Sequence, residues 1–127
     1  MVNFGPPETV PAKFKDRRFY QHNPQVTLMR TTREENTQLG HRLAEKLNLS
    51  TGPLTVLLPL RGNSLISAPG GAFHDPEADQ ALFSSLKGRL RADIQVLELD
   101  CAINDAIFAE ACAEELLKFI RYCVTAR

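Results

Sequence analysis

Residues 54–75 read LTVLLPLRGNSLISAPGGAFHD, an apolar run followed by a long polar loop. The run from Leu54 to Leu60 is almost entirely apolar, which is typical of a strand covered on both faces in a parallel sheet. In open α/β sheets, ligands bind outside the carboxyl ends of the strands. The loop that follows this strand is therefore predicted to bind a ligand through Arg61, Gly62, Ser64 and the Pro69-Gly70-Gly71 turn.

Two further strands and three helices are predicted around this run. Val26–Met29 and Asp93–Leu99 have the apolar pattern of strands. The order β-α-β-α-β-α, with right-handed crossovers, predicts an α/β fold: a three-layer, Rossmann-like arrangement with a short parallel sheet. The helices are predicted to begin at Thr31 or Thr32, with Glu34 and Glu35 at capping-box spacing, at Asp75-Pro76, and at Asn104 or Asp105, and the last is predicted to end at about Cys123.

Apolar spacing on the helices predicts which faces are buried. Leu39, Leu43 and Leu47 recur every four residues and predict a narrow buried stripe on the first helix. The last helix carries two neighbouring stripes, which predict a core helix with part of its face available to another subunit. These stripes are Phe108, Cys112, Leu116, Phe119 and Cys123, and Ala109, Ala113, Leu117, Ile120 and Val124.

The chain is predicted to divide at about residue 25. Residues 1–24 contain Gly5-Pro6-Pro7, Pro11 and Asn23-Pro24 and are predicted to be irregular. Residues 25–127 form an α/β half-domain with three strands, fewer than the usual four to six. We therefore expect the sheet to be completed by missing upstream residues or by another chain.

Composition excludes some classes of function. The 127 residues hold 15 Lys and Arg against 15 Asp and Glu, so no net charge favours DNA or a membrane surface. No apolar run approaches the roughly 20 residues that span a bilayer. Three cysteines without zinc-ligand spacing fit a reducing, cytoplasmic environment, and no metal site is predicted.

Each candidate binding residue also has a structural interpretation. Arg61 can hold a phosphate or carboxylate in a two-pronged bond, or pair with Asp100 or Asp105. A helix start attracts anions, yet most polar residues there are only caps, and the two glycines either admit a ligand or form a plain turn. The candidate ligand-binding set is Thr31, Arg61, Gly62, Ser64, Gly70, Gly71, Asn104 and Asp105.

Two other classes of function stay open. Cys101 follows the third strand, and His74 on the neighbouring loop can serve as its base, so a hydrolase or transferase is one alternative. No local nucleophile signature surrounds Cys101. The other alternative is a structural domain that assembles with an upstream domain or forms a homo-oligomer, without a ligand of its own.

Four separated segments also carry a family resemblance. MVNFGPPETVPAKF, QHNPQVTLMRTTREENTQLG, LPLRGNSLISAPGGAFHDPEADQALFSSLK and INDAIFAEA together resemble the C-terminal part of the tomato-mosaic-resistance-protein-like ATP-binding family, which includes a bacterial uncharacterised protein family. The resemblance implies nucleotide binding, most often of ATP, with no settled reaction. It also implies that the chain is the last third of a protein of two Rossmann-like domains, in which Met1 is an internal residue.

The chain departs from the family pattern at two ionisable positions. Ala102 stands before the IND motif where members usually carry His, and Ser67 stands before APG where they usually carry Asp. If those residues serve the chemistry of active relatives, this chain binds its ligand without reacting. Ala106 also replaces the usual proline after IND.

Overall fold

The computed structural model describes the backbone of residues 1–125 and the side chains of residues 1–121. Within this part, β1 (Val2–Phe4), β2 (Phe19–Asn23) and β3 (Val26–Met29) form an antiparallel sheet in the order β1-β3-β2. A second sheet pairs β4 (Thr55–Pro59) in parallel with β5 (Gln95–Leu99). The helices are α1 (Arg33–Leu47), α2 (Pro76–Lys87) and α3 (Ala106–Thr125).

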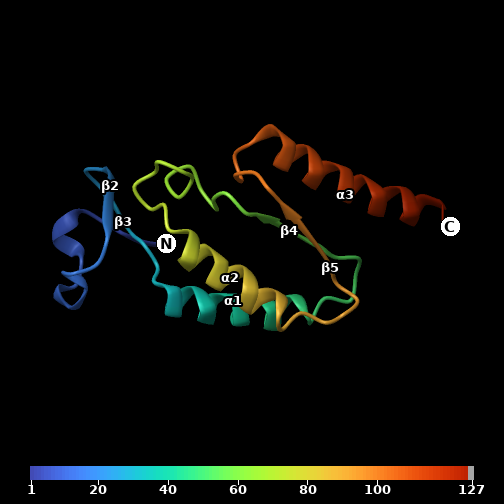
Figure 1. Ribbon diagram of the computed structural model, residues 1–127, viewed down its shortest axis with the longest axis horizontal. Coiled ribbons are helices and arrows are strands. Elements are labelled where there is room, and N and C mark those ends of the chain that lie inside the picture. The colour runs from blue at the N-terminus through green and yellow to red at the C-terminus, as the bar shows by residue number, and fades with distance from the viewer. Residues whose placement is uncertain (126–127) are drawn as a thin grey trace.

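The parallel sheet lies between two layers of helix. Figure 1 shows α1 and α2 on one side of β4 and β5, α3 on the other side, and the antiparallel sheet at one end of the molecule. One core cluster consists of Ala44, Leu58, Phe83 and Leu86, which join α1 and α2 to β4. This arrangement confirms the predicted α/β class with a small parallel sheet, and it is compatible with part of a Rossmann-like fold.

The predicted membership of the parallel sheet was wrong for one strand. Val26–Met29 is a strand, as predicted, but it pairs antiparallel, with Met29 opposite both Val2 and Phe19. The parallel sheet therefore has two strands within the described residues rather than three. The cause is local, because a hairpin partner a few residues away costs less chain entropy to pair than a distant strand.

The sequence predicted irregular structure for residues 1–24, and this prediction was wrong. These residues contain β1, β2 and two single 3₁₀ turns, η1 (Pro7–Thr9) and η2 (Ala12–Phe14). Pro24-Gln25 is the tight turn between β2 and β3, where the side-chain oxygen of Asn23, the last residue of β2, accepts the Gln25 N–H at 2.8 Å. Prolines and glycines that predicted irregular structure instead form the turns between short elements.

The predicted helix starts of α1 and α2 are confirmed in detail. Thr32 caps α1 in a capping box: its hydroxyl accepts the Glu35 N–H, and the Glu35 carboxylate accepts the Thr32 N–H. Asp75 caps α2 by accepting the Ala78 N–H at 3.0 Å, and Pro76 is the first helical residue. A short polar residue ahead of an apolar pattern therefore correctly predicted where both α1 and α2 begin.

Two of the three leucines in the predicted stripe of α1 are not on its buried face, which corrects the prediction, whereas Leu47 is partly buried against the core. Leu39 and Leu43 are each 44% exposed, whereas the buried positions are Asn36, Gly40 and Ala44. A Cβ on Gly40 would lie 2.6 Å from the Leu82 carbonyl oxygen and 2.9 Å from the Leu86 nitrogen. The two helices therefore pack backbone to backbone through small residues, and the leucines lie beside that contact.

Helix α3 is less buried than its two apolar stripes predicted. It occupies the predicted range, and Phe108 is buried, but Leu116, Leu117 and Ile120 are exposed. The side chains of Cys123 and Val124, which belong to the predicted stripes, lie outside the described residues. None of the helices in residues 1–125 has the length and apolar character needed to cross a bilayer.

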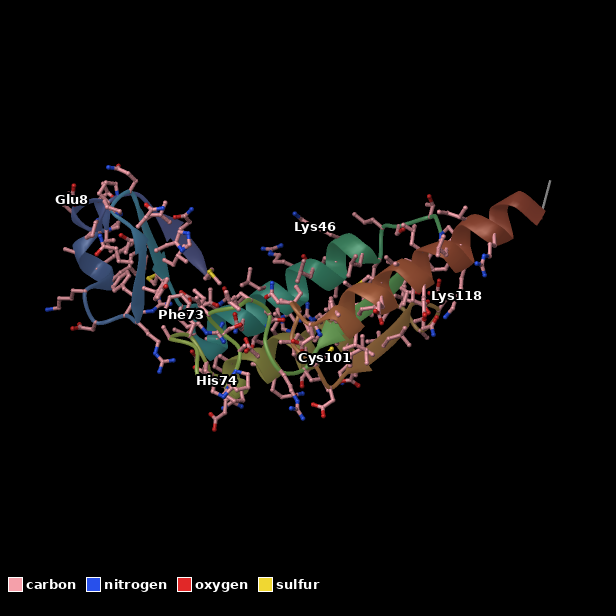
Figure 2. The ribbon with its side chains drawn as sticks, turned by 90° about the horizontal axis from the view of Figure 1, so that it is seen from above. Glu8, Lys46, Phe73, His74, Cys101 and Lys118 are labelled. Atoms are coloured by element: carbon pink, nitrogen blue, oxygen red, sulfur yellow. The ribbon has the colours of Figure 1, made fainter. Side chains whose placement is uncertain are left out.

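Several contacts tie the antiparallel sheet and the segment before β2 to the rest of the chain, among them the following three. Arg17 donates to both carboxylate oxygens of Glu35 on α1, at 3.0 and 2.6 Å. The rings of Tyr20 and Phe73 meet edge to face with centroids 6.2 Å apart, and Figure 2 shows Phe73 at the junction. The third contact, from Arg30 at the end of β3, is the centre of the candidate site.

We predict that Gly40→Ala destabilises the chain although alanine favours a helix. The new methyl group would meet the backbone of α2, and such overpacking costs about 1–3 kcal/mol or more, against roughly 1 kcal/mol gained in helix propensity. Urea unfolding followed by circular dichroism measures the difference. Gly52→Ala is the matched control, because nothing lies within 4 Å of that position. Equal midpoints for the two variants would contradict the close packing.

We predict that Glu35→Gln lowers stability only where Glu35 is ionised. The Arg17 guanidinium holds the pKa of this carboxyl below its usual range, and a glutamine still completes the capping box. The ionised carboxylate stabilises the fold above its unfolded pKa of about 4.3, and this contribution is lost as the pH falls through the lowered folded pKa.

Denaturant titrations of the two proteins across pH 2–7 test this expectation. The difference in free energy of unfolding should be about 1 kcal/mol or less, because the pair is partly exposed. It should be constant above about pH 5 and shrink at lower pH. A difference that does not change with pH would assign the effect to something other than the ion pair.

Candidate functional site

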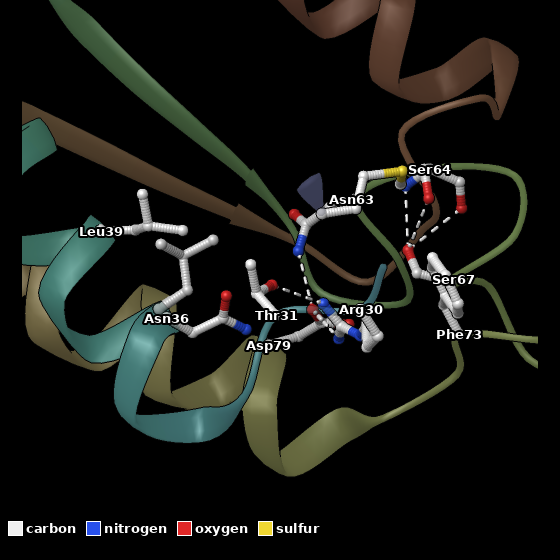
Figure 3. Close-up of a pocket in the computed structure, with 11 residues that line it drawn as sticks. Arg30, Thr31, Asn36, Leu39, Asn63, Ser64, Ser67, Phe73 and Asp79 are labelled. Atoms are coloured by element: carbon white, nitrogen blue, oxygen red, sulfur yellow. Dashed lines mark hydrogen bonds and ion pairs between the residues drawn. The ribbon is translucent and has the colours of Figure 1, made fainter. Parts of the chain in front are cut away.

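A polar cleft of about 280 Å³ lies where the antiparallel sheet meets the helical layers. Three segments form most of it, namely the junction from β3 to α1, the loop after β4, and the first half of α2, and Met1 also lines it. Figure 3 shows the side chains of these segments converging on the same space. We call this space the Arg30 cleft; it is lined by Met1, Arg30, Thr31, Asn36, Leu39, Asn63, Ser64, Ser67, Phe73, Asp79 and Leu82.

Arg30 is the central charge of the cleft. It follows β3 directly, and one guanidinium nitrogen donates to the Asp79 carboxylate at 2.6 Å and to the Asp75 carbonyl at 3.3 Å. The two side chains of the ion pair are 9% and 7% exposed. The Nε of Arg30 is buried and has no hydrogen-bond partner among the described residues. A buried guanidinium N–H without a partner is rare, because it costs free energy comparable to a lost hydrogen bond.

Amide and hydroxyl groups surround this ion pair. The Asn63 amide donates to the same Asp79 oxygen at 3.1 Å, and the Asn36 amide donates to the Ala78 carbonyl at 2.7 Å. The Ser64 hydroxyl and backbone N–H both donate to the Ser67 hydroxyl oxygen, at 3.1 and 3.0 Å. The cleft therefore presents a guanidinium paired with a carboxylate, two amides and two linked hydroxyls to any ligand that enters it.

The loops after β4 and β5 lie side by side, as the parallel pairing predicted. The Arg61 N–H donates to the Cys101 carbonyl at 3.0 Å, and the Ile103 N–H donates to the Gly62 carbonyl at 2.9 Å. Arg61 and the start of α3 thus share one end of the sheet. We call this second group of candidate residues the strand-end rim; it contains Arg61, Gly62, Asn104 and Asp105.

Arg61 has the structural partner that the sequence left open. Its guanidinium forms a two-pronged ion pair with Asp100, at 2.7 and 2.8 Å. The pair raises the pKa of Arg61 and lowers the pKa of Asp100. Both side chains are more than half exposed, so a competing anion can reach the guanidinium at low cost.

The glycines of the loop have structural roles. A Cβ on Gly62, whose φ is +149°, would lie 2.8 Å from the Ala68 Cα, and one on Gly71 would lie 2.3 Å from the Ile66 carbonyl oxygen. Gly70 has a φ of +84° and nothing within 4 Å, which is the conformation of a turn glycine. The loop therefore folds closely on itself, and this packing explains the glycines without a ligand.

Two of the predicted residues, Thr31 and Ser64, line the Arg30 cleft. The predicted residues outside its lining are the strand-end rim, Gly70 and Gly71. Sequence reasoning missed Arg30, Asn36, Asn63, Ser67, Phe73 and Asp79. One available signal was the position of Arg30 immediately after a strand, which is the position that had singled out Arg61.

Cys101 does not have the surroundings of a nucleophile. Its side chain is buried, and this burial, with Asp105 and Asp100 nearby, raises the pKa of the thiol. A reactive cysteine needs the opposite shift, because the thiolate is the attacking species. The His74 ring nitrogen Nδ1 lies 3.2 Å from the Ser67 carbonyl oxygen, so a backbone group occupies that side of the proposed base.

Comparisons with known proteins identify relatives of the chain. The family model described as "Uncharacterised protein family (UPF0261) C-terminal domain" matches residues 1–120. A UPF0261 protein of Clostridium tetani is 47% identical over 121 residues, which are 94% of this chain and 30% of the relative. A UPF0261 protein of Rhizobium meliloti is 52% identical over 113 residues, which are 87% of this chain and 28% of the relative.

A plant protein is also similar. The ToMV resistance protein Tm-1(GCR237) of Solanum lycopersicum is 44% identical over 120 residues, which are 93% of this chain and 16% of that protein. The chain therefore spans less than a third of the length of these relatives.

We predict that Cys101 resists alkylation in the folded chain. Its raised pKa lies above the usual value of about 8.5, so little thiolate is present at pH 7.5. Iodoacetamide labelling followed by mass spectrometry should modify Cys101 at least about tenfold more slowly in the folded chain than in urea. The half-buried Cys112 is the internal reference. Rapid, selective labelling of Cys101 in the folded chain would restore the enzymatic interpretation.

Proposed function

The chain belongs to the UPF0261 C-terminal domain family, and we propose that it binds the anionic group of a phosphorylated small molecule in the Arg30 cleft. The first candidate ligand is a nucleotide, with ATP foremost, which the sequence resemblance implied. The chemistry of the cleft supports the binding of an anion, and the family resemblance suggests that this anion belongs to a nucleotide.

The observation that carries this proposal is the buried guanidinium of Arg30. Its other nitrogens hold Asp79, Asp75 and the Thr31 hydroxyl, but Nε has no partner among the described residues. A phosphate or carboxylate oxygen is the natural partner for such a group, because guanidinium N–H groups form short, strong hydrogen bonds with anions. A ligand oxygen at this position would satisfy a donor that the fold leaves open.

The surroundings of Arg30 suit an anion. A second hollow of about 360 Å³ shares Arg30 and Thr31 with the cleft and is also lined by Arg17, Arg18 and Arg33. The N-terminus of α1 begins at the same place, and its backbone dipole favours negative charge. Asp16 and Asp75 also line this hollow and offset part of the positive charge.

The size of the cleft limits what enters it. Its volume of about 280 Å³ lies at the lower end of the range of roughly 300–1,000 Å³ for small-molecule sites. A compact phosphorylated metabolite fits within this volume. For a nucleotide, we propose that only the phosphate end enters the cleft and that the remainder lies outside it.

We propose binding without a reaction by this chain. The two positions at which the resembled family usually carries ionisable residues hold Ala102 and Ser67 here. Ser67 lines the cleft, where its hydroxyl accepts hydrogen bonds from Ser64. A serine hydroxyl is a far weaker base than a carboxylate, and the carboxylate that does line the cleft, that of Asp79, is already paired with Arg30.

We predict that phosphorylated ligands stabilise the chain and that Arg30→Lys weakens their binding. Lysine keeps the positive charge beside Asp79 but lacks Nε and the planar fork. The loss should be about 1.5–3 kcal/mol, the scale of a charged hydrogen bond, or roughly tenfold or more in affinity. Thermal-shift and calorimetric titrations with ATP, ADP, a sugar phosphate and inorganic phosphate measure it.

Arg61→Ala is the matched variant, because Arg61 is the candidate arginine of the strand-end rim. Binding that depends on Arg30 and not on Arg61 would support the Arg30 cleft as the binding site. Binding that depends on Arg61 alone would move the site to the strand ends. The absence of any thermal shift with all four ligands would contradict the proposed function.

A further inference from the structure

Strand β4 has one edge without a pairing strand among the described residues. The Leu60 N–H donates to the Leu99 carbonyl, and the register pairs Thr55 with Gln95 and Pro59 with Leu99. Backbone groups alternate between the two sides of a strand. The N–H groups of Thr55 and Leu57 and the carbonyls of Thr55, Leu57 and Pro59 therefore point away from β5.

Pro59 fits this interpretation. A proline within a sheet is tolerated where its missing N–H does not interrupt a ladder. At position 59 the missing donor falls on the free edge, so the pairing with β5 loses no hydrogen bond. Because the Pro59 carbonyl accepts the Gly62 N–H at 3.4 Å, the free edge presents two donors and two acceptors to a further strand, all from Thr55 and Leu57.

An apolar groove of about 460 Å³ runs along this edge. Helices α1 and α2 form one wall and α3, with the loop before it, forms the other. We call it the β4 groove; it is lined by Leu43, Leu47, Val56, Leu57, Leu58, Pro59, Asn63, Leu82, Phe83, Leu86, Ile103, Phe108 and Cys112. All of these side chains except Asn63 are apolar, so the groove offers a dry contact to an occupant with apolar side chains on both faces.

The walls of the groove include apolar side chains that the described structure covers only in part. Leu43 is 44% exposed and Ile103 is 40% exposed. Leu43 belongs to the stripe that the sequence predicted to be buried. An added strand would cover these side chains and so restore the predicted burial.

We infer that the β4 groove receives a single β-strand from the part of the longer protein outside these 127 residues. The strand would add to β4 through the Thr55 and Leu57 backbone groups and place apolar side chains against both α1 and α3. This is strand addition to an exposed sheet edge, in which main-chain hydrogen bonds supply affinity and side-chain pockets supply specificity.

The shape of the groove favours one strand over a second copy of the chain. Helices already wall the free edge on both faces, through Leu43 and Leu47 of α1 and Phe108 and Cys112 of α3. A second copy that paired its own β4 here would bring its own α1 and α3 to the same positions. A lone strand carries no helices and needs only the width of one strand, about 4.8 Å.

The relatives supply a source for that strand. The matched region is 30% of the Clostridium tetani protein and 28% of the Rhizobium meliloti protein. A strand in the same polypeptide also acts at a high effective concentration, of millimolar order for a short linker. The inference concerns a different face from the Arg30 cleft and does not depend on the proposed function.

A peptide-binding experiment tests the inference. The probes are overlapping 12-residue peptides that cover the part of the Clostridium tetani relative outside the matched region. We expect one apolar peptide to bind the 127-residue chain and to slow hydrogen exchange at the Thr55 and Leu57 amides, which exchange rapidly without it. The Val56 and Leu58 amides, which face β5, should be protected with or without the peptide.

Two matched variants locate the binding surface. Leu43→Glu places a carboxylate in the groove wall and should weaken binding about tenfold or more. Leu49→Glu makes the same change at a leucine that is 80% exposed and outside the groove, and it should leave binding unchanged. Circular dichroism confirms that both variants fold.

Three outcomes would overturn the inference. One is that no peptide binds the chain, and another is that Leu43→Glu and Leu49→Glu affect binding equally. The third is that analytical ultracentrifugation finds a stable dimer whose Leu57 amide is protected, which would assign the groove to a second copy.

Discussion

The buried ion pair between Arg30 and Asp79 holds three distant segments of the chain at one point. Arg30 ends the antiparallel sheet, Asp79 lies in the first turn of α2, and Asn63 from the loop after β4 donates to the same Asp79 oxygen. Two charges this deeply buried require each other, since removing one partner costs about 3–5 kcal/mol. The pair therefore fixes where the antiparallel sheet sits relative to the helical layers.

The position of the candidate site follows from this constraint. The Arg30 cleft forms where the three segments meet, between a strand end, a loop and a helix start, and the neighbouring N-terminus of α1 adds its dipole. The parallel strands β4 and β5 present a second set of polar groups at their carboxyl ends, in the strand-end rim. The loop that begins at Arg61 contributes residues to both sets. Cleft residues from this loop therefore lie close in sequence to the residues predicted from the strand ends.

Local chemistry made much of the fold predictable from the sequence. Thr32 with Glu35, and Asp75 with Pro76, located two helix starts, because caps act within a few residues. The apolar run before Arg61 identified β4 as a parallel strand. Most of the cleft was not predicted, because residues such as Arg30, Asn36 and Asp79 come from elements whose contact depends on tertiary packing and not on spacing along the chain.

The antiparallel sheet was missed for a related reason. Strands of three to five residues separated by prolines give too short an alternation to identify. Val26–Met29 was found as a strand, but the choice between a parallel and an antiparallel partner depends on residues elsewhere in the chain. Asn23-Pro24, interpreted as punctuation before a strand, instead joins the end of β2 to the Pro24-Gln25 hairpin turn, which sets the antiparallel pairing.

The error on α1 differs from the others. The leucines do recur along one face of the helix, but that face is not the one buried against α2. Leu39, Leu43 and Leu47 have the spacing of a core-facing stripe, yet α1 contacts α2 through Gly40 and Ala44 instead. A helix with one face of small residues against a neighbour and a second face of leucines has two partners to satisfy. Helix α2 is the first of these partners, and the second is the strand that we infer to lie in the β4 groove.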